Sequence, residues 1–153
     1  MGEILKQRIH QTSFASPFHE ATLSLLVAAA TIEEAMEETC EKYGVTSAQY
    51  NVLRILRGAY PDGHARCNII DRMVKKAPDV TRLIDRLVSV GYATRGKSKD
   101  DGRLSLTFIT PKGLKLLDKM EADVRAVNEQ ITSFMSERDA RSLTKICEKL
   151  IQQ

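Results

Sequence analysis

Apolar residues recur at steps of three and four along segment 78–90, and this spacing predicts one buried face of an α-helix. Pro78 suits the first turn of such a helix, and Gly91 suits the position just beyond its end. The opposite face of the helix is polar and carries Asp79, Arg82, Arg86 and Ser89. We therefore expect this face to leave the core and to contact a partner.

Two short runs of strand-forming residues follow this helix, at 92–95 and 104–109. The segment between them, 96–103, has glycine near both ends and several lysine and arginine residues. It predicts a two-stranded hairpin with a basic tip. A helix that leads directly into such a hairpin is the arrangement of a DNA-binding winged helix.

The rest of the chain is predominantly helical in pattern. A helix with an acidic outer face is expected over 18–42, after a polar segment, 1–17, that we interpret as a loosely docked arm. Thr46 and Gln49 match the capping box of a helix over 47–57, which Gly58 closes, and a short helix over 65–75 follows. The expected fold class is mainly α with a small two- or three-stranded β wing, that is, a winged helix-turn-helix with dimerisation helices at both ends.

The C-terminal third begins with Thr110 and Pro111, which suit the start of another helix. Apolar residues then follow at intervals of 3, 4, 3, 4 and 3, the spacing of a seam between packed helices: Leu117, Met120, Val124, Val127, Ile131 and Phe134. A last amphipathic helix after Ser136 carries Leu143, Ile146 and Leu150. An intramolecular bundle and a dimer interface built from both termini fit this pattern. We favour the dimer interface, because a protein that binds a two-fold symmetric DNA site does so as a dimer.

Length and charge narrow the class of protein. A chain of 153 residues suits one domain, 1–153, which we divide into a winged-helix lobe at 45–110 and helical dimerisation regions at 18–43 and 111–153. The net charge is only +3, but segment 64–115 holds twelve Lys and Arg against five Asp and Glu, which gives +7 there and leaves −4 elsewhere. Such a concentration attracts a polyanion such as DNA, although a solvated charged face has the same composition.

Other classes of protein find little support. No apolar run approaches the roughly 20 residues that cross a bilayer, and residues 1–20 lack a hydrophobic signal core, so we expect no membrane association and a cytoplasmic protein. A Gly-rich phosphate loop, a nucleophile elbow and a metal-ligand cluster are all missing, which argues against an enzyme, a cofactor and a metal. Asp100 and Asp101 are paired carboxylates, but a glycine-flanked tip offers them no pocket.

An ordered set of short motifs runs through nearly the whole chain: Thr46-Ser47-Ala48-Gln49-Tyr50-Asn51-Val52-Leu53, Asp79-Val80-Thr81-Arg82-Leu83-Ile84-Asp85-Arg86-Leu87, Gly91-Tyr92, Arg95, Asp101-Gly102-Arg103 and Ile109-Thr110-Pro111-Lys112-Gly113. This set resembles the MarR (multiple-antibiotic-resistance regulator) family of bacterial transcription factors. The resemblance implies a homodimer with two winged-helix lobes in a triangular arrangement. It also implies recognition of a pseudo-palindromic double-stranded DNA operator, with the helix in the major groove and the wing in the minor groove.

Carried over to this sequence, the resemblance implies that the recognition helix presents to DNA the residues Pro78, Asp79, Thr81, Arg82 and Arg86. Arg82 is the expected base reader, because its guanidinium can donate to two acceptors of guanine. Arg86 either contacts DNA or pairs with Asp85 or the wing. Asp79 is expected to be a helix cap, an arginine partner or an acceptor from cytosine. Ser47 either donates to a phosphate at a helix N-terminus or merely caps that helix.

In the wing, the resemblance matches Asp101 and Arg103 to an Asp-x-Arg motif. Arg103 is expected to enter the minor groove, where a narrow groove has an enhanced negative potential. Lys97 and Lys99 would attract phosphates without reading sequence, and Arg95 is expected to contribute to the same surface.

The regulatory signal is less marked in the sequence. The resemblance implies that a small aromatic or lipophilic effector, if there is one, binds between the dimerisation helices and the DNA lobes. Either such a pocket or the core would accommodate Tyr50, Met73 and the segment 23–26. We expect a repressor. A redox-responsive regulator using Cys67, which follows a basic residue, is one alternative, and a winged helix that acts only in protein assembly is another. Cys40 and Cys147 are expected to be packing residues.

Overall fold

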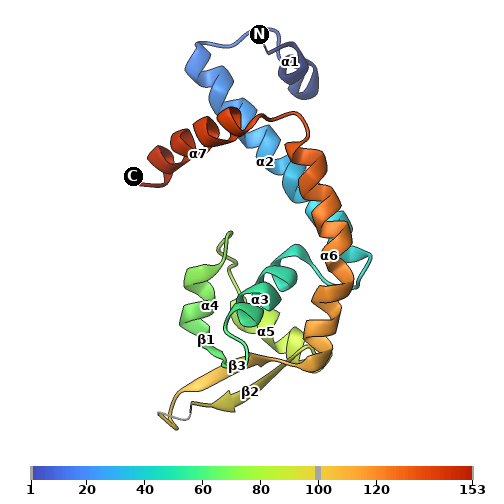
Figure 1. Ribbon diagram of the computed structural model, residues 1–153. Coiled ribbons are helices and arrows are strands. Elements are labelled where there is room, and N and C mark those ends of the chain that lie inside the picture. The colour runs from blue at the N-terminus through green and yellow to red at the C-terminus, as the bar shows by residue number, and fades with distance from the viewer. Residues whose placement is uncertain (1, 99–100, 153) are drawn as a thin grey trace.

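The computed structural model describes residues 2–98 and 101–152. Its elements follow in the order α1 (Glu3–Ile9), α2 (Pro17–Glu41), α3 (Ser47–Gly58), β1 (His64–Ala65), α4 (Arg66–Arg72), α5 (Val80–Ser89), β2 (Ala93–Lys97), β3 (Ser105–Ile109), α6 (Pro111–Thr132) and α7 (Glu137–Ile151). Figure 1 shows a lobe built from α3, α4, α5 and the sheet, from which α2 and α6 rise as long helices toward α1 and α7. The predicted winged helix-turn-helix fold is confirmed, with three strands in the sheet.

One apolar core holds the lobe together. The strands are antiparallel in the order β1-β3-β2, with Ala93 opposite Ile109 and His64 opposite Thr107. Helices α3, α4 and α5 all contribute fully buried aliphatic side chains: Leu53, Leu56, Ile69, Ile84 and Leu87. Burying one such side chain contributes about 1.5–3 kcal/mol. The core therefore fixes α5 firmly against the rest of the lobe.

Both ends of α5 are capped. Asp79 is the N-cap residue, and its Oδ1 accepts a hydrogen bond from the Arg82 N–H at 2.9 Å. The helix consequently begins at Val80, and the predicted start at Pro78 is wrong because Asp79 terminates the helix at that end. At the other end Gly91 has φ +79°, and the two backbone N–H groups after Val90 donate back into the last turn. This is the Schellman arrangement, and it confirms the predicted stop at glycine.

Three other expectations are wrong in detail. Helix α4 ends at Arg72 rather than near 75, because Met73 turns to an extended backbone with ψ 131°. Gly58 is the last residue of α3 instead of a left-handed residue after it. Segment 1–17 is more than a loosely docked arm, since α1 packs on α2 and buries Leu5. The capping box predicted at Thr46 is present, and Ser136 forms a second one with Asp139 at the start of α7.

The apolar stripe of α6 divides into two parts. Leu117, Met120 and Val124 are at most 6% exposed, because they belong to the core of the lobe. Their predicted place in a dimer interface is therefore wrong, and the intramolecular alternative holds for them. Further along, Val127 is half-buried and Phe134 is exposed. The side chain of Ile131 lies outside the described part of the chain.

The N-terminal half of α2 and the whole of α7 have little cover. Segment 21–32 of α2 contains no charged residue, yet only Leu23 and Val27 in it are half-buried. Within the described ranges α7 has no buried residue, and its apolar positions Leu143, Ile146 and Leu150 are all exposed. Neither α2 nor any other described helix combines the length and apolar character that crossing a bilayer requires.

Gly113 allows the first turn of α6 to lie against the start of the wing. A Cβ atom at this position would overlap the carbonyl oxygen of Tyr92 and lie 2.8 Å from Cγ1 of Ile109. We expect Gly113→Ala to lower the free energy of unfolding by about 1–3 kcal/mol, the usual cost of overpacking, as measured by denaturant unfolding. The control is Gly102→Ala, whose Cβ would meet nothing within 4 Å. Equal midpoints for the two variants would contradict this account.

Candidate nucleic-acid interface

The outward face of α5 is polar and exposed. Val80, Ile84 and Leu87 bury the inner face, so Thr81, Arg82, Asp85, Arg86 and Ser89 point away from the core. The Arg82 side chain is 87% exposed, and its Nε lies 3.7 Å from Oδ2 of Asp79. Among the described residues the Arg86 guanidinium makes no ion pair. Both arginines are therefore available to a partner.

An ion pair joins α5 to the wing. Nη2 of Arg95, on β2, donates to Oδ1 of Asp85, on α5. Of the alternatives for Arg86, the pair with Asp85 is therefore wrong, because adjacent helix residues point in different directions and β2 brings Arg95 to Asp85 instead. Arg95 was predicted to contact DNA, but its guanidinium is bound to Asp85 within the protein and connects α5 to the wing.

A backbone hydrogen bond joins the two sides of the wing just beyond the last paired residues of β2 and β3. The Ser98 N–H donates to the carbonyl of Leu104 at 2.9 Å, and Oδ1 of Asp101 accepts from the Arg103 N–H at 2.9 Å. Asp101 therefore shapes the turn that carries Arg103, as Asx turns do. The side chains of Arg103 and Lys97 are exposed. Lys99 lies outside the described residues.

Lys112 is a residue of this site that the sequence did not single out. Its Nζ donates to the carbonyl of Val90, the C-cap residue of α5, at 2.7 Å and lies 5.0 Å from the centroid of the Tyr92 ring. A cation at a helix C-terminus is favourable because carbonyl groups point there. Lys112 thus ties the first turn of α6 to the end of the recognition helix. In the sequence it belongs to the motif 109–113, which assigned it no contact of its own.

Ser47 does not fit a phosphate contact. Its backbone N–H, at the N-terminus of α3, donates to Oε2 of Glu37 at 2.9 Å. A carboxylate already occupies this positive end of the helix and repels a second anion. The capping alternative for Ser47 is also wrong, because the cap is Thr46.

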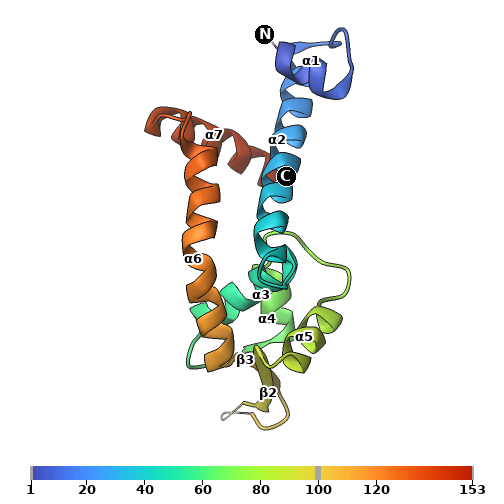
Figure 2. The same cartoon turned by 90° about the vertical axis from the view of Figure 1, so that its right-hand side faces the viewer.

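The exposed cations of α5 and of the wing share one end of the molecule. Figure 2 shows α5 and the β2–β3 hairpin together at the end opposite α1 and α7. Helix α2, which leads away from that end, carries six glutamates and no lysine or arginine. The uneven charge of the sequence is therefore also uneven in space, and the cationic end is the natural contact for a polyanion.

The three cysteines differ in access, and Cys147 on α7 is half-buried. Cys40 is fully buried in the core, and its burial raises the pKa of the thiol to about 11. This confirms its predicted packing role. Cys67 is exposed on α4, with Sγ 3.7 Å from Oδ1 of Asn68.

We expect a maleimide probe at pH 7 to label Cys67 rapidly and Cys40 only after unfolding, because the thiolate is the reactive form and a raised pKa depletes it. Peptide mass mapping of the folded protein measures both sites. Cys67→Ser is the control that removes the fast site. Rapid labelling of Cys40 in folded protein would contradict the placement of this residue.

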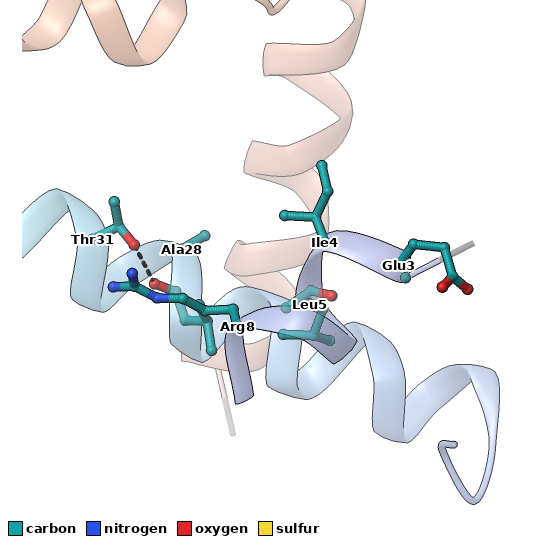
Figure 3. A pocket seen from close by; sticks show the side chains of 9 residues that line it. Glu3, Ile4, Leu5, Arg8, Ala28 and Thr31 are labelled. Atoms are coloured by element: carbon teal, nitrogen blue, oxygen red, sulfur yellow. Dashed lines mark hydrogen bonds between the residues drawn. The ribbon is translucent and has the colours of Figure 1, made fainter. Parts of the chain in front are cut away.

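A shallow apolar groove of about 710 Å³ lies between α1 and α2. Figure 3 shows Ile4, Leu5 and Arg8 of α1 opposite Ala28 and Thr31 of α2. This is not the predicted place for an effector, between helices and lobe. Of the residues suggested for such a pocket, Met73 is buried in the core and Tyr50 packs against it.

No family model matches the chain. In sequence it is similar to the HTH-type transcriptional repressor MdtR of Bacillus subtilis, with 30% identity over 131 residues that span 85% of this chain and 83% of that protein. In structure it is similar to a MarR transcription factor from Planctomyces limnophilus, with 34% identity, a TM-score of 0.68 and coverage of 89% of this chain and 98% of the other.

A complex of S. aureus MepR with DNA has the same fold. Its TM-score to this chain is 0.76, and the alignment covers 86% of this chain and 96% of MepR at 18% identity. At that identity the likeness concerns the fold alone. The two relatives of higher identity carry the assignment to a family.

Proposed function

The chain belongs to the MarR family of winged helix-turn-helix transcription regulators, and we propose that it binds a pseudo-palindromic DNA operator as a homodimer and represses transcription. The observation that carries this proposal is the exposed cationic surface of α5 and the wing, with Arg82, Arg86, Lys97 and Arg103. Because Asp85 and Arg95 join helix and wing, the two parts meet DNA as one unit. MepR, which shares the fold, has been crystallised with DNA.

In this proposal each part of the surface has its own task. Arg82 reads base edges in the major groove, with Arg86 and Thr81 beside it on α5. Arg103 enters the minor groove, and Lys97 with Lys99 attracts phosphates. Two aspartates support these groups: Asp79 caps α5, and Asp101 shapes the turn before Arg103. Pro78, just before α5, stays a proposed DNA contact.

The homodimer is supported by apolar surface that the protomer leaves open. Large apolar side chains are exposed on α1, α2, α7 and the segment between α6 and α7: Ile4, Phe18, Leu26, Phe134, Leu143, Ile146, Leu150 and Ile151. Large exposed apolar surfaces of this kind often mark sites of protein–protein contact. We propose that these elements of two copies cover one another, with the groove between α1 and α2 as part of that contact.

Repression is proposed from the relative MdtR, whose name describes a transcriptional repressor. Release by a small aromatic or lipophilic effector completes the proposal. A ligand that changes the separation of the two recognition helices would weaken both half-site contacts together. A thermal-shift screen with phenolic acids tests this idea, and stabilisation without any loss of operator affinity would exclude release by those ligands.

Selection of bound duplexes from a random DNA pool by the purified protein tests the function. We expect enrichment of an inverted repeat whose half-sites lie about 10 base pairs apart. Affinity for it should fall steeply as salt rises, because bound phosphates release counterions. An absence of binding at low salt would overturn the proposal and favour a role in protein assembly. Salt-dependent binding without enrichment would overturn operator recognition alone.

Arg82→Ala is expected to relax sequence preference at one base pair of each half-site. The loss should be about 1–3 kcal/mol for the selected operator and much less for unrelated DNA. Titration of both duplexes at one salt concentration measures the difference. An equal loss for both duplexes would mean that Arg82 contacts phosphate instead of a base.

A further inference from the structure

The loop between α4 and α5, residues 73–79, is held at three points. The Val74 N–H donates to Oδ1 of Asn51, on α3, at 3.1 Å. Nζ of Lys76 donates to the carbonyl of Ile70, on α4, at 2.7 Å. Nζ of Lys75 lies 2.8 Å from Oε2 of Glu33, on α2. This loop leads directly into the recognition helix, so these contacts fix where α5 begins.

Glu33 lies where α2 leaves the lobe. One turn further along, Met36 packs against the core of the lobe, and Cys40 is buried in it. On the other side of Glu33, α2 runs exposed toward α1. Figure 2 shows the α4–α5 loop rising beside this part of α2. The Glu33–Lys75 pair therefore links the part of α2 outside the lobe to the segment before the recognition helix.

Among the described residues no other ion pair makes this link. The Arg8–Glu34 pair joins α1 to α2, and the Arg57–Asp118 pair joins α3 to α6. On the far side, Tyr43 donates to Oδ2 of Asp123 and so fixes the end of α2 to α6. If the lobe tilted about the points where α2 and α6 enter it, the Tyr43–Asp123 hydrogen bond would stay in place. Glu33 would, however, move away from Lys75.

We propose that Glu33 is a positioning residue for operator recognition, which acts through Lys75 to set the half-site spacing that the dimer accepts. The inference rests on the proposed function. The two recognition helices must sit about one DNA turn apart, so a lobe free to tilt would accept other spacings. An exposed ion pair is weak by itself, but Asn51 already holds the backbone next to Lys75, and the dimer contains the pair twice.

The test compares Glu33→Gln with the matched control Glu34→Gln in the full-length protein. Each variant loses one carboxylate from neighbouring positions of α2, but Glu34 faces Arg8 of α1. Affinity is measured for the selected operator and for duplexes of equal length with one base pair added or removed between the half-sites. Because the duplexes carry the same number of phosphates, the ratio of affinities cancels general charge effects.

We expect wild type and Glu34→Gln to discriminate equally between spacings, whereas Glu33→Gln should lose about threefold or more of that discrimination. The half-site sequence that it selects should not change. The double variant Glu33→Lys with Lys75→Glu should recover the discrimination, because it restores an ion pair with reversed charges. A merely structural role would lower all affinities together and leave the ratio unchanged.

The inference is overturned if Glu33→Gln keeps the wild-type ratio, if Glu34→Gln changes it equally, or if the charge reversal restores nothing. Failure of the proposed function would give a different experimental result. In that case wild type itself would enrich no inverted repeat, and the inference would fall with it.

Discussion

Replacement of Arg103 by alanine is expected to weaken operator binding at least about thirtyfold and to leave the fold intact. The side chain is exposed, and the backbone N–H of Arg103 donates to Asp101 in the turn. Alanine keeps that N–H, so the hairpin should persist. An arginine contact to DNA contributes about 1–3 kcal/mol, and a dimer has two wings. Footprinting titration against the selected operator measures the loss.

The matched control for this variant is Arg125→Ala. Arg125 is equally a surface arginine, paired with Glu121 on α6 at 3.5 Å, far along the chain from the wing. The control removes the same charge and should change operator affinity little. Unchanged binding by Arg103→Ala would exclude the minor-groove role, and equal losses in both variants would reduce the effect to net charge.

Local patterns of the sequence predicted local structure well. Thr46, Asp79, Thr110 and Ser136 each cap a helix through a side chain that reaches only three residues ahead, and Gly91 ends α5 by its own left-handed backbone. Such features depend on a few neighbouring residues, so a sequence contains all the information they need.

Contacts between distant segments were the ones that the sequence could not assign. The apolar stripe from Leu117 to Phe134 keeps the same spacing throughout. Such a spacing predicts that one face of the helix is covered, but it does not tell which element covers it. The lobe covers its first half, since α3 and the end of α2 reach that far. In the same way, Arg95 meets Asp85 only because β2 folds back beside α5. Glu37 meets Ser47 only because the chain turns after α2.

For the candidate site, the family resemblance suggested which residues contact DNA. The structure divides these residues into exposed cations and residues that have partners within the protein. Arg82, Arg86, Lys97 and Arg103 remain as exposed cations. Others have partners within the protein that explain their presence without DNA: Asp79, Arg95, Asp101 and Ser47. A DNA-binding surface needs residues that hold its contact residues in place, so the same motif can contain both kinds of residue.

The apolar face of α7 leads to the second large effect. We expect Ile146→Asp to produce a monomer of 17.1 kDa that binds the operator about 10²–10⁴ times more weakly than wild type. A charge on a surface that another copy must cover costs desolvation, whereas in the protomer Ile146 is 59% exposed and the fold should tolerate the change. A monomer reads one half-site and loses the second, linked contact. Sedimentation equilibrium and operator titration measure the two effects.

Thr144→Asp provides the control on the same helix. Thr144 is exposed, and its hydroxyl donates to the carbonyl of Ala140 within α7, so the variant adds the same charge away from the apolar face. This protein should remain dimeric and bind as wild type does. If Ile146→Asp stayed dimeric, α7 would not form the interface and the open faces of α1 and α2 would have to supply it alone. If it became monomeric and kept full affinity, one lobe would suffice for recognition, and the two-fold operator would be excluded.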